Sequence, residues 1–384
     1  MAFKNEVNKQ KSVKLSISKT QKFSEWYSTF LEYAEIVDTR YPLKGCDVWR
    51  SYGFKGLKLM MQIMEQFLDN TGHEEAYFPM FVPISIFSKE SDFLEGFTGE
   101  ALHIVGTGNR QFEEQLVVRP TSETVMYYMF EKWIRSYRDL PLKIYQTVNI
   151  FRWETKMTRP LLRIREIIKF KEAHTAHSTA AGAEEQIREA LQIYSTFFTR
   201  LGIAHLILRT PTWDTFAGAQ YNYDLFTILP DGKAIELGSV INLGQKFSRA
   251  FGISFRDEDG EEQFVWQTCY GISERALGTA LALHGDDHGL IFPPQIAPIQ
   301  IIIVPIIGTQ NKYYNEILTM AEQIVRLLTA YRVIIDNSAR TPGWKFHHWE
   351  AKGVPLRIEI GKHEVKENCV SIIRRDTQSR IQCD

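Results

Sequence analysis

The sequence predicts an α+β protein in two parts, a large antiparallel sheet with flanking helices and a small α/β domain after it. Three observations support this prediction. Before residue 293, strand patterns follow one another in long succession and do not alternate with helices, which favours antiparallel pairing. Three prolines from Phe292 to Pro298 then precede a new apolar strand. Beyond them strands and helices alternate, as in a compact α/β module. We therefore divide the chain into domains 1–293 and 294–384.

The expected elements follow from the spacing of apolar residues. A helix is expected over Glu184–Arg200, where an apolar stripe recurs at helical spacing. Strands are expected at Tyr221–Leu229, Ala234–Leu237 and Gln263–Tyr270, with a turn at 230–232. In the second domain the order is strand, helix, strand, helix, strand, strand, which predicts a mixed sheet. These six elements are Gln300–Pro305, Tyr313–Ala330, Val333–Asp336, Trp344–Ala351, Leu356–Ile360 and Val370–Arg374.

Composition excludes some classes of protein. The 384 residues include 44% hydrophobic and 24% charged residues, which is ordinary for globular proteins and excludes a largely disordered chain. Lys and Arg number 45 against 46 Asp and Glu, so bulk charge does not hold this protein on nucleic acid. From residue 293 onward the chain has twelve Lys or Arg residues and nine Asp or Glu residues. This local excess of positive charge is compatible with RNA contact.

The cysteines and the apolar runs indicate a soluble, intracellular protein. Cys46, Cys269, Cys369 and Cys383 lie far apart without a CxxC pair, which predicts reduced thiols and neither a disulfide framework nor a zinc knuckle. The N-terminal segment is polar and basic without an apolar core, unlike a secretory signal. The longest apolar run, roughly residues 299–307, is too short to span a bilayer.

Common nucleotide and hydrolase motifs are absent from the sequence. It contains neither G-x-x-x-x-G-K-[ST] nor a G-x-G-x-x-G at a strand–helix turn, so P-loop and Rossmann sites are unsupported. It also lacks H-E-x-x-H and G-x-S-x-G. A nucleotide would therefore have to be bound by another device.

An arginine-rich segment, residues 151–166, is the candidate for that device. It carries Arg152, Arg159, Arg163 and Arg165 among apolar residues, with a turn near Pro160. A strand–loop–strand arrangement would direct Arg152 and Arg163 into one cleft, where two guanidinium groups clamp phosphates. An arginine-laced surface hairpin paired with acidic neighbours explains the same residues.

Three further segments carry candidate groups. In Val118–Thr124, Thr121 and Glu123 suit a substrate ammonium group, although a helix N-cap with an acid in the first turn is an equal alternative. His174 and His177 have the spacing of metal ligands on a helix, but no third ligand follows, and we expect no metal. The HGDDH segment at 284–288 is better explained as a polar loop. Arg275 opens a small-residue helix and suits a terminal phosphate or a salt bridge.

Several segments of the chain are informative when taken together and in order. They are RPTSET, FRWETKMTRPLLRIREI, FKEAHTAH, FAGAQY, LGQKF, QTCYGISER, HGDDHGL and TPGWKFHHWEAKGVPLRIEIG. Together they resemble the prolyl-tRNA synthetases, in the archaeal and eukaryote-like branch of that class II family, over roughly residues 20–384. The resemblance implies the class II antiparallel sheet, an anticodon-binding-like second domain, and activation of proline by ATP and Mg²⁺ as prolyl-adenylate, with transfer to the 3′ end of proline tRNA. It also implies a cytoplasmic homodimer.

By this resemblance, residues 72–79 are motif 1, the dimer-interface element. Arg152 holds the α-phosphate and the amino-acid carboxylate, and Glu154 contacts the adenine. Arg163 matches the motif 2 loop arginine, and Arg275 matches the motif 3 arginine at the far phosphates. A preorganised guanidinium with Mg²⁺ stabilises the charge on a pentavalent phosphorus without a protein base, so Arg152 and Arg275 are the expected catalytic residues.

The remaining implied residues complete the two binding sites. Thr121 and Glu123 match the pair that binds the imino group of proline. The expected ATP-binding residues are Arg152, Glu154, Arg163, Glu236, Ser239 and Arg275. The expected amino-acid-binding residues are Thr121, Glu123, Arg152, Phe170, Glu172, His174, Phe216, Ser239 and Ile241. No residue of the chain is expected to ligate a metal.

The chain departs from the family pattern at several positions. Glu236 replaces a glutamine that contacts ATP, and Ile241 replaces a histidine beside the amino-acid site, with Asn242 following it. Asn222 replaces a threonine, and Lys246 replaces an asparagine. We interpret these changes as clustered on the substrate side, as altered substrate choice would produce, with neutral drift as the alternative. The chain also ends where this branch continues into a further domain, so it is a truncated chain or a shortened paralogue.

Three functions remain open at this level. The first is a prolyl-tRNA synthetase. The second is a paralogue that adenylates a different or non-standard amino acid and transfers it to a non-tRNA acceptor. The third is a non-catalytic binding or regulatory protein. The third is disfavoured because Arg152, Arg163 and Arg275 remain, and arginines cost stability unless something pairs with them. The second domain, with its segment from Thr341, favours the synthetase and a tRNA partner.

Overall fold

The computed structural model describes residues 17–97, 99–307 and 312–383. The prediction about the polar N-terminal segment concerns mainly residues 1–16, which lie outside the described residues. The chain forms two compact units. Of the described residues, the large unit comprises 39–48, 60–97 and 99–279, and the small unit comprises 17–38, 49–59, 280–307 and 312–383. The single boundary predicted at residue 293 stays a prediction.

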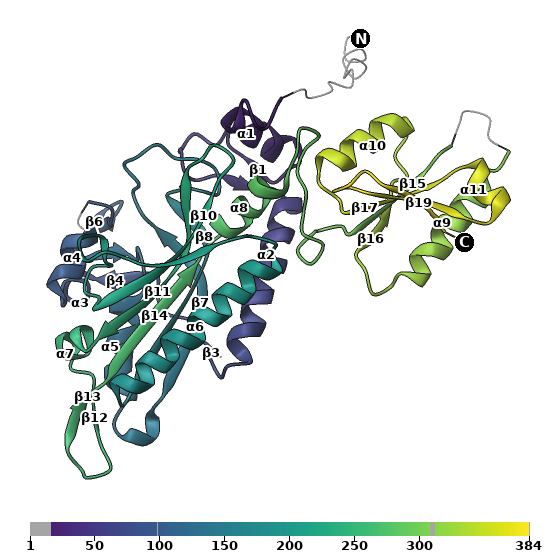
Figure 1. Ribbon diagram of the computed structural model, residues 1–384. Helices are drawn as coiled ribbons and strands as arrows, with labels where there is room; N and C mark the ends of the chain where they lie inside the picture. Colours follow the sequence, from purple (N-terminus) through teal and green to yellow (C-terminus); the bar gives the residue numbers. More distant parts are fainter. Residues whose placement is uncertain (1–16, 98, 308–311, 384) are drawn as a thin grey trace. The chain divides into compact units, whose positions relative to one another are not determined.

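The large unit is built on a seven-stranded sheet (Figure 1). All neighbouring strands pair antiparallel except the first two, which pair parallel. The predicted α+β fold with a largely antiparallel sheet is therefore confirmed. In spatial order the strands are β3 (Glu74–Glu75), β7 (Leu142–Phe151), β8 (Glu166–His177), β14 (Trp266–Ile272), β11 (Ala234–Gly244), β10 (Tyr221–Ile228) and β9 (Leu206–Arg209).

The two faces of this sheet are covered by different helices. Helix α6 (Ala180–Arg200) lies along one face, while α5 (Glu123–Trp133) and α7 (Lys246–Phe251) pack on the other (Figure 1). Because successive strand residues point to opposite faces, Tyr270 contacts Tyr194 of α6, whereas Cys269 joins the core beside α5 and α7. We call these the α6 face and the α5 face.

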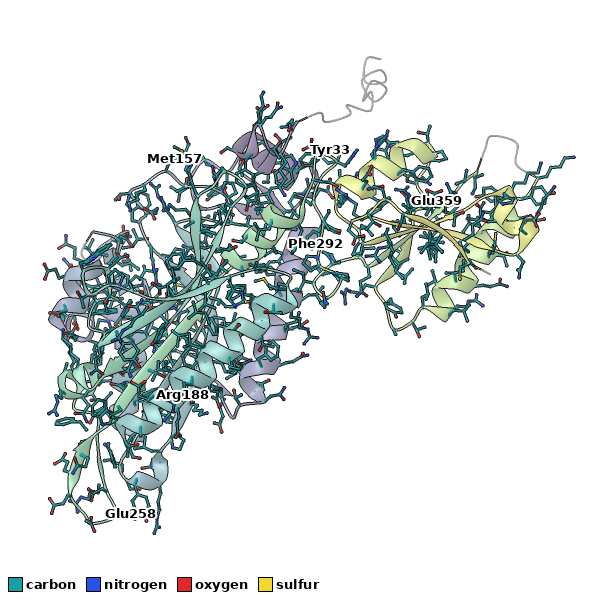
Figure 2. The ribbon with its side chains drawn as sticks, in the orientation of Figure 1. Tyr33, Met157, Arg188, Glu258, Phe292 and Glu359 are labelled. Atoms are coloured by element: carbon teal, nitrogen blue, oxygen red, sulfur yellow. The ribbon has the colours of Figure 1, made fainter. Side chains whose placement is uncertain are left out.

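Smaller elements complete the large unit. A three-stranded sheet is formed by β4, β6 and β5, and a hairpin is formed by β12 and β13, with Glu258 in its exposed turn (Figure 2). The predicted strand Gln263–Tyr270 is divided at Val265 between this hairpin and β14. The bounds are β4 (Phe81–Pro83), α3 (Ile84–Phe87), α4 (Ser91–Phe97), β5 (Leu102–Thr107), β6 (Arg110–Val118), η1 (Tyr137–Asp139), η2 (Thr212–Asp214), β12 (Ser254–Arg256) and β13 (Glu262–Phe264).

The small unit contains a five-stranded mixed sheet, as predicted. Its spatial order is β16 (Val333–Ile335), β15 (Ile301–Pro305), β17 (Leu356–Ile360), β18 (Val370–Arg374) and β19 (Arg380–Cys383), with β15 parallel to β16 and β17 and the last two pairs antiparallel. Side chains of β15 alternate, so Ile303 joins the core under α9 and Ile302 joins the core under α10. The sequence prediction missed β19 and α11. The helices are α9 (Tyr314–Leu327), α10 (Pro342–Ala351) and α11 (Lys362–Glu367).

The helix predicted at 184–200 is confirmed and begins earlier, at Ala180. The hydroxyl of Thr179 accepts a hydrogen bond from Gly182 N at 3.0 Å and caps the helix. The other elements are α1 (Phe23–Tyr33), β1 (Val37–Asp38), β2 (Val48–Trp49), α2 (Ser51–Asp69) and α8 (Arg275–His284). Among the described residues, every helix is too short or too polar to cross a membrane. All four cysteines carry free thiols.

Candidate active site

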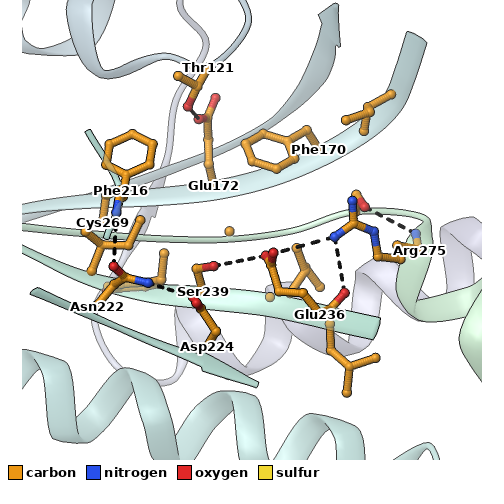
Figure 3. Close-up of a pocket in the computed structure, with 18 of the residues that line it drawn as sticks. Thr121, Phe170, Glu172, Phe216, Asn222, Asp224, Glu236, Ser239, Cys269 and Arg275 are labelled. Atoms are coloured by element: carbon orange, nitrogen blue, oxygen red, sulfur yellow. Dashed lines mark hydrogen bonds and ion pairs between the residues drawn. The ribbon is translucent and has the colours of Figure 1, made fainter. Parts of the chain in front are cut away.

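A cavity of about 370 Å³ opens on the α5 face of the large sheet (Figure 3). Its walls come from β8, β14, β11 and β10, from the start of α5 and α8, and from the loop after η2. The structure therefore brings together most of the residues predicted to form a site. These are Thr121, Glu123, Arg152, Phe170, Glu172, His174, Phe216, Glu236, Ser239, Ile241 and Arg275.

Two rows of residues run across the strands and form the floor of the cavity. Each row results from antiparallel register, which places one residue of each strand opposite a residue of the next. Residues two positions apart on a strand point to the same face of the sheet, and the two rows are two positions apart on each strand. Both rows therefore face the cavity. The first row is His174, Cys269, Ile241 and Asn222, and the second row is Glu172, Gly271, Ser239 and Asp224.

Arg152 follows the last residue of β7 and is anchored from two directions. Its Nε donates to the carbonyl oxygen of Pro120 at 2.8 Å. Its guanidinium lies over the rings of Phe97 and Phe170, at 5.5 and 5.7 Å from their centroids. Burial lowers the pKa of the Arg152 guanidinium from its ordinary value. The interaction with Glu123 is the largest effect that raises this pKa. An arginine stays protonated in such a site, so the cavity contains a fixed cation.

Arg275 is the second cation of the cavity and is the first residue of α8. Its Nε donates to Leu162 O at 3.1 Å and its Nη1 donates to Glu236 O at 3.2 Å. The carboxylate of Glu236 lies 3.9 Å from the same Nη1 and accepts a hydrogen bond from Ser239 Oγ at 3.0 Å (Figure 3). Three of the residues predicted to bind a nucleotide are thus in mutual contact.

Two buried carboxylates lie in the other half of the cavity and differ in their partners. Glu172 accepts hydrogen bonds from Gln146 Nε2 at 3.0 Å and from Thr121 Oγ1 and Ser122 N, each at 3.3 Å. Burial opposes its ionisation, but His174, Ser122 and Gln146 outweigh burial and lower its pKa. Burial raises the pKa of Glu123, whose Oε2 has no hydrogen-bond partner among the described residues. A buried carboxylate in that condition favours a cationic ligand.

The only group of metal-type ligands found among the described residues also lies here. Atoms of Glu123, His174 and Cys269 are within 4.8 Å of one another. Burial raises the pKa of the Cys269 thiol well above its ordinary value, so the thiol stays protonated. Both ring nitrogens of His174 are engaged, by the Tyr127 hydroxyl at 2.9 Å and by Glu172 at 3.4 Å. This chemistry fits an ammonium ion better than a metal ion.

The predicted helical spacing of His174 and His177 is wrong. Both residues lie on strand β8, where positions three apart face opposite sides. His174 lines the cavity, and His177 accordingly lies on the α6 face and pairs with Thr175.

Two residues of the arginine-rich segment that were predicted to bind ATP, Glu154 and Arg163, lie outside the cavity lining. Arg163 is exposed, and its Nε lies 3.6 Å from a carboxylate oxygen of Glu154. The expected cleft shared by Arg152 and Arg163 is not present in this arrangement. The roles of Arg163 and Glu154 in nucleotide binding stay predictions.

The departures from the family pattern divide into two groups. Glu236, Ile241 and Asn222 line the cavity, as the interpretation of a substrate-side cluster requires. That interpretation is wrong for the other two residues. Asn242 lies on the α6 face and donates to Glu184 Oε1 at 2.9 Å, because Ile241 before it takes the cavity side. Lys246 pairs with Glu90 at 3.6 Å and with Asp92.

The sequence prediction missed several residues of the lining, notably Cys269, Gly271 and Asp224. A Cβ atom on Gly271 would lie 2.9 Å from Cζ of Phe170, so the glycine leaves room for that ring. The sequence signal that could have identified Cys269 and Gly271 is the alternation of side-chain direction along the Cys-Tyr-Gly segment. Once β14 is placed beside β8, Cys269 and Gly271 must face the same side as His174 and Glu172.

Glu274, directly before Arg275, gives rise to a prediction about stability. Its carboxyl is fully buried and accepts a hydrogen bond from Ile168 N at 2.9 Å, while Oε2 has no partner among the described residues. Burial raises its pKa to about 7. The folded state therefore retains a proton that the unfolded state loses near pH 4.5, so this group's stabilising contribution falls as pH rises towards 7.

We expect Glu274→Gln to abolish this dependence. Relative to the parent protein, the free energy of unfolding of the variant should increase by about 3 kcal/mol between pH 5 and pH 8. Urea unfolding at both pH values, followed by circular dichroism, measures the difference. Glu258→Gln in the exposed β12–β13 turn is the matched control and should show none of it. Equal pH dependence in parent and Glu274→Gln proteins would contradict the prediction.

Two family models match the chain. The model described as the tRNA synthetase class II core domain (G, H, P, S and T) matches residues 105–284, which include the whole cavity lining. The model described as the anticodon binding domain matches residues 300–384.

Individual proteins resemble nearly the whole chain. A proline–tRNA ligase of Methanocaldococcus jannaschii is 48% identical over 363 residues, which are 94% of this chain and 79% of the relative. A proline–tRNA ligase of Ignicoccus hospitalis is 44% identical over 372 residues, which are 96% of this chain and 78% of the relative. The solved structure of Giardia lamblia prolyl-tRNA synthetase in complex with prolyl-adenylate superposes with a TM-score of 0.93 at 38% identity. It covers 96% of this chain and 76% of the other.

Proposed function

The chain belongs to the prolyl-tRNA synthetase family, and on that premise we propose how its cavity activates proline. As a class II aminoacyl-tRNA synthetase it is a ligase that joins proline to tRNA at the expense of ATP. The observation that carries the proposal is the buried carboxylate of Glu123, a residue that lines the cavity and has one oxygen without a hydrogen-bond partner among the described residues.

We propose that the first half of the cavity binds proline. The secondary ammonium of proline supplies the counter-charge that Glu123 needs, and the hydroxyl of Thr121 offers a further oxygen. The apolar ring contacts Phe216 and Phe170, which line the same space. Glu172 is held by its own hydrogen bonds and keeps Thr121 in place. An amino acid without a ring would leave apolar surface uncovered and lose part of the burial energy.

The second half of the cavity is proposed to bind ATP. Arg152 lies between the two halves, where it contacts the proline carboxylate and the α-phosphate. Arg275 contacts the far phosphates, and Glu236 and Ser239 contact the nucleotide beside it. The donor set fits a magnesium nucleotide, since Mg²⁺ is held mainly by phosphate oxygens with one or two carboxylates, and Glu236 is such a carboxylate. Bound Mg²⁺ would neutralise phosphate charge.

In the proposed reaction, a carboxylate oxygen of proline attacks the α-phosphorus of ATP. The new P–O bond forms as the bond to the β-phosphate oxygen breaks, and pyrophosphate leaves. No proton is transferred, because the attacking group is already a carboxylate. The protein's contribution is to place the two anions together and to stabilise the charge of the pentavalent phosphorus with Arg152. The terminal ribose hydroxyl of tRNA then attacks the carbonyl carbon of the adenylate, an ester bond to proline forms as the bond to the phosphate oxygen breaks, and AMP and the hydroxyl proton leave.

Three further features are proposed at the level of the whole chain. A catalytic domain ends near residue 293 and an anticodon-binding domain follows, since the two family matches end at 284 and begin at 300. The motif 1 segment forms a homodimer, supported by the exposed edge strand β3 and by Tyr77, which is 73% exposed. Sedimentation equilibrium tests the dimer. The protein acts in the cytoplasm, a compartment in which four free thiols persist.

Amino-acid-dependent ATP–pyrophosphate exchange tests the activity. We expect strong exchange with proline, weak exchange with the other standard amino acids, and loss of exchange on removal of Mg²⁺ by EDTA. Excess Mg²⁺ should restore it. Stronger exchange with another amino acid would contradict the assignment of the pocket to proline, and exchange that persists in EDTA would contradict the role of Mg²⁺.

A further inference from the structure

Asn222 lies at the end of the first row, and both the oxygen and the nitrogen of its side-chain amide form hydrogen bonds. It is 3% exposed, lines the cavity, and pairs across the sheet with Ile241. Its Oδ1 accepts a hydrogen bond from Phe216 N at 3.1 Å. Its Nδ2 donates to Thr210 Oγ1 at 2.7 Å. The same nitrogen donates to Asp224 Oδ1 at 2.9 Å (Figure 3).

The three contacts fix which way the amide points. A backbone N–H can only donate, so the amide oxygen must face Phe216 and the amide nitrogen must face Thr210 and Asp224. Thr210 also donates to Asp224 through its hydroxyl, which gives that buried carboxylate two donors. Each buried polar group of this cluster is therefore satisfied, which makes the geometry costly to change.

The cluster holds the loop that carries Phe216. This loop follows η2 and turns back into β10, with Ala219 N donating to Phe216 O at 2.9 Å. The Phe216 ring packs against Phe93 and Phe97, each at 6.4 Å between centroids, and forms part of the cavity wall. Asn222 thus connects the backbone of a wall residue to the floor of the cavity.

A threonine at this position would not form the same contacts. Its hydroxyl is one bond shorter and has a single hydrogen, so it cannot donate to both Thr210 and Asp224 while accepting from Phe216 N. An alanine would leave Phe216 N and the Asp224 carboxylate each short of a partner. The asparagine therefore holds the Phe216 loop in a position that threonine or alanine would not maintain.

We propose that Asn222, which stands where the family pattern has a threonine, is a positioning residue that acts with Thr210 and Asp224 to fix Phe216 against the bound amino acid in this chain, and so contributes to the preference for proline over smaller amino acids. This inference rests on the proposed function, because it assumes that Phe216 contacts the proline ring. Asn222 acts through the Phe216 backbone and not by contacting the substrate.

The test is Asn222→Thr in amino-acid-dependent ATP–pyrophosphate exchange. We expect KM for proline to rise about 5- to 10-fold, the equivalent of one or two lost hydrogen bonds. KM for ATP should change less than about twofold, because Arg275 and Glu236 lie at the other end of the cavity. The ratio of kcat/KM for proline to that for alanine should fall by a similar factor.

The matched control is Asn242→Thr. Asn242 is also a buried asparagine with a fully bonded amide, bound to Glu184 and to Gly244 N, but it lies on the α6 face. It should lower the thermal stability of the protein comparably while leaving KM for proline unchanged. Equal increases in KM for proline in the two variants would show a general loss of structure and overturn the proposal.

A double-mutant cycle with Phe216→Ala separates positioning from direct contact. If Asn222 acts through Phe216, Asn222→Thr should have little additional effect on KM for proline in the Phe216→Ala protein. Full additivity of the two changes, or an unchanged KM in Asn222→Thr alone, overturns the proposal. If the parent protein shows no proline-dependent exchange, the proposed function itself fails, and that outcome is distinct from both.

Discussion

Replacing Arg152 by alanine is expected to lower kcat/KM for proline-dependent ATP–pyrophosphate exchange by roughly 10³-fold. A group that stabilises charge appearing only in the transition state of phosphoryl chemistry typically contributes an effect of this size. Arg152 is suited to the role because it is anchored at Nε by Pro120 and packed between Phe97 and Phe170, so little reorganisation is needed on reaction.

Two variants define what Arg152 contributes. Arg152→Lys retains the charge but loses the planar fork, and we expect an intermediate loss of about 10²-fold. Arg249→Ala removes an exposed arginine that bonds Gln245 away from the cavity, and its exchange rate should match the parent. An Arg152→Ala protein that retains more than a tenth of the parental kcat/KM would exclude Arg152 from transition-state stabilisation.

Glu123→Gln is expected to raise KM for proline by about 100-fold. The substitution keeps the shape of the side chain but removes the carboxylate whose Oε2 has no hydrogen-bond partner among the described residues, while Glu172 is already engaged by Gln146 and Thr121. Loss of one partner of a buried charge pair costs about 3 kcal/mol. KM for ATP should change by less than about threefold. Exchange kinetics with each substrate varied in turn measure both constants.

The fold of the Glu123→Gln protein should be retained. Burial already raises the pKa of Glu123, so a neutral amide at this position removes an unfavourable charge and does not create one. Thermal unfolding should therefore show a midpoint equal to or above that of the parent. Glu113→Gln on the exposed strand β6 is the control for both measurements. An unchanged KM for proline would remove Glu123 from the amino-acid site.

The sequence predicted the sheet type and the mixed second domain, and most of the residues it predicted for the site line the cavity, because each depends on local patterns or on ordered motifs. It did not predict α11 and β19, which are short elements whose position depends on the sheet they join. It also misplaced Asn242. Strand alternation places that residue opposite Ile241, so the error came from treating neighbouring changes as one cluster and was avoidable from the residues alone.

The pairing of residues across strands was beyond the sequence. Asn222 stood out as a departure, but its contact with Phe216 depends on a loop conformation and on the register of β10 with β11. Cys269 similarly gains meaning only when β14 is known to lie between β8 and β11. Arg163 shows the opposite case. Its motif match predicted a place beside Arg152 in one cleft, but its side chain lies outside the cavity lining and next to Glu154.

The two cross-strand rows also affect how the protein acquires its activity. The row contacts between β8 and β14 and between β14 and β11 join strands that are not consecutive in the chain, so each of them closes a long loop, whereas β10 and β11 form a hairpin. No single hairpin or helix contains even half of the pocket. Contacts of high sequence separation form slowly and late. A partly folded chain with its helices in place would therefore lack the binding site, and recovery of enzymatic activity after dilution from denaturant reports the completion of the sheet.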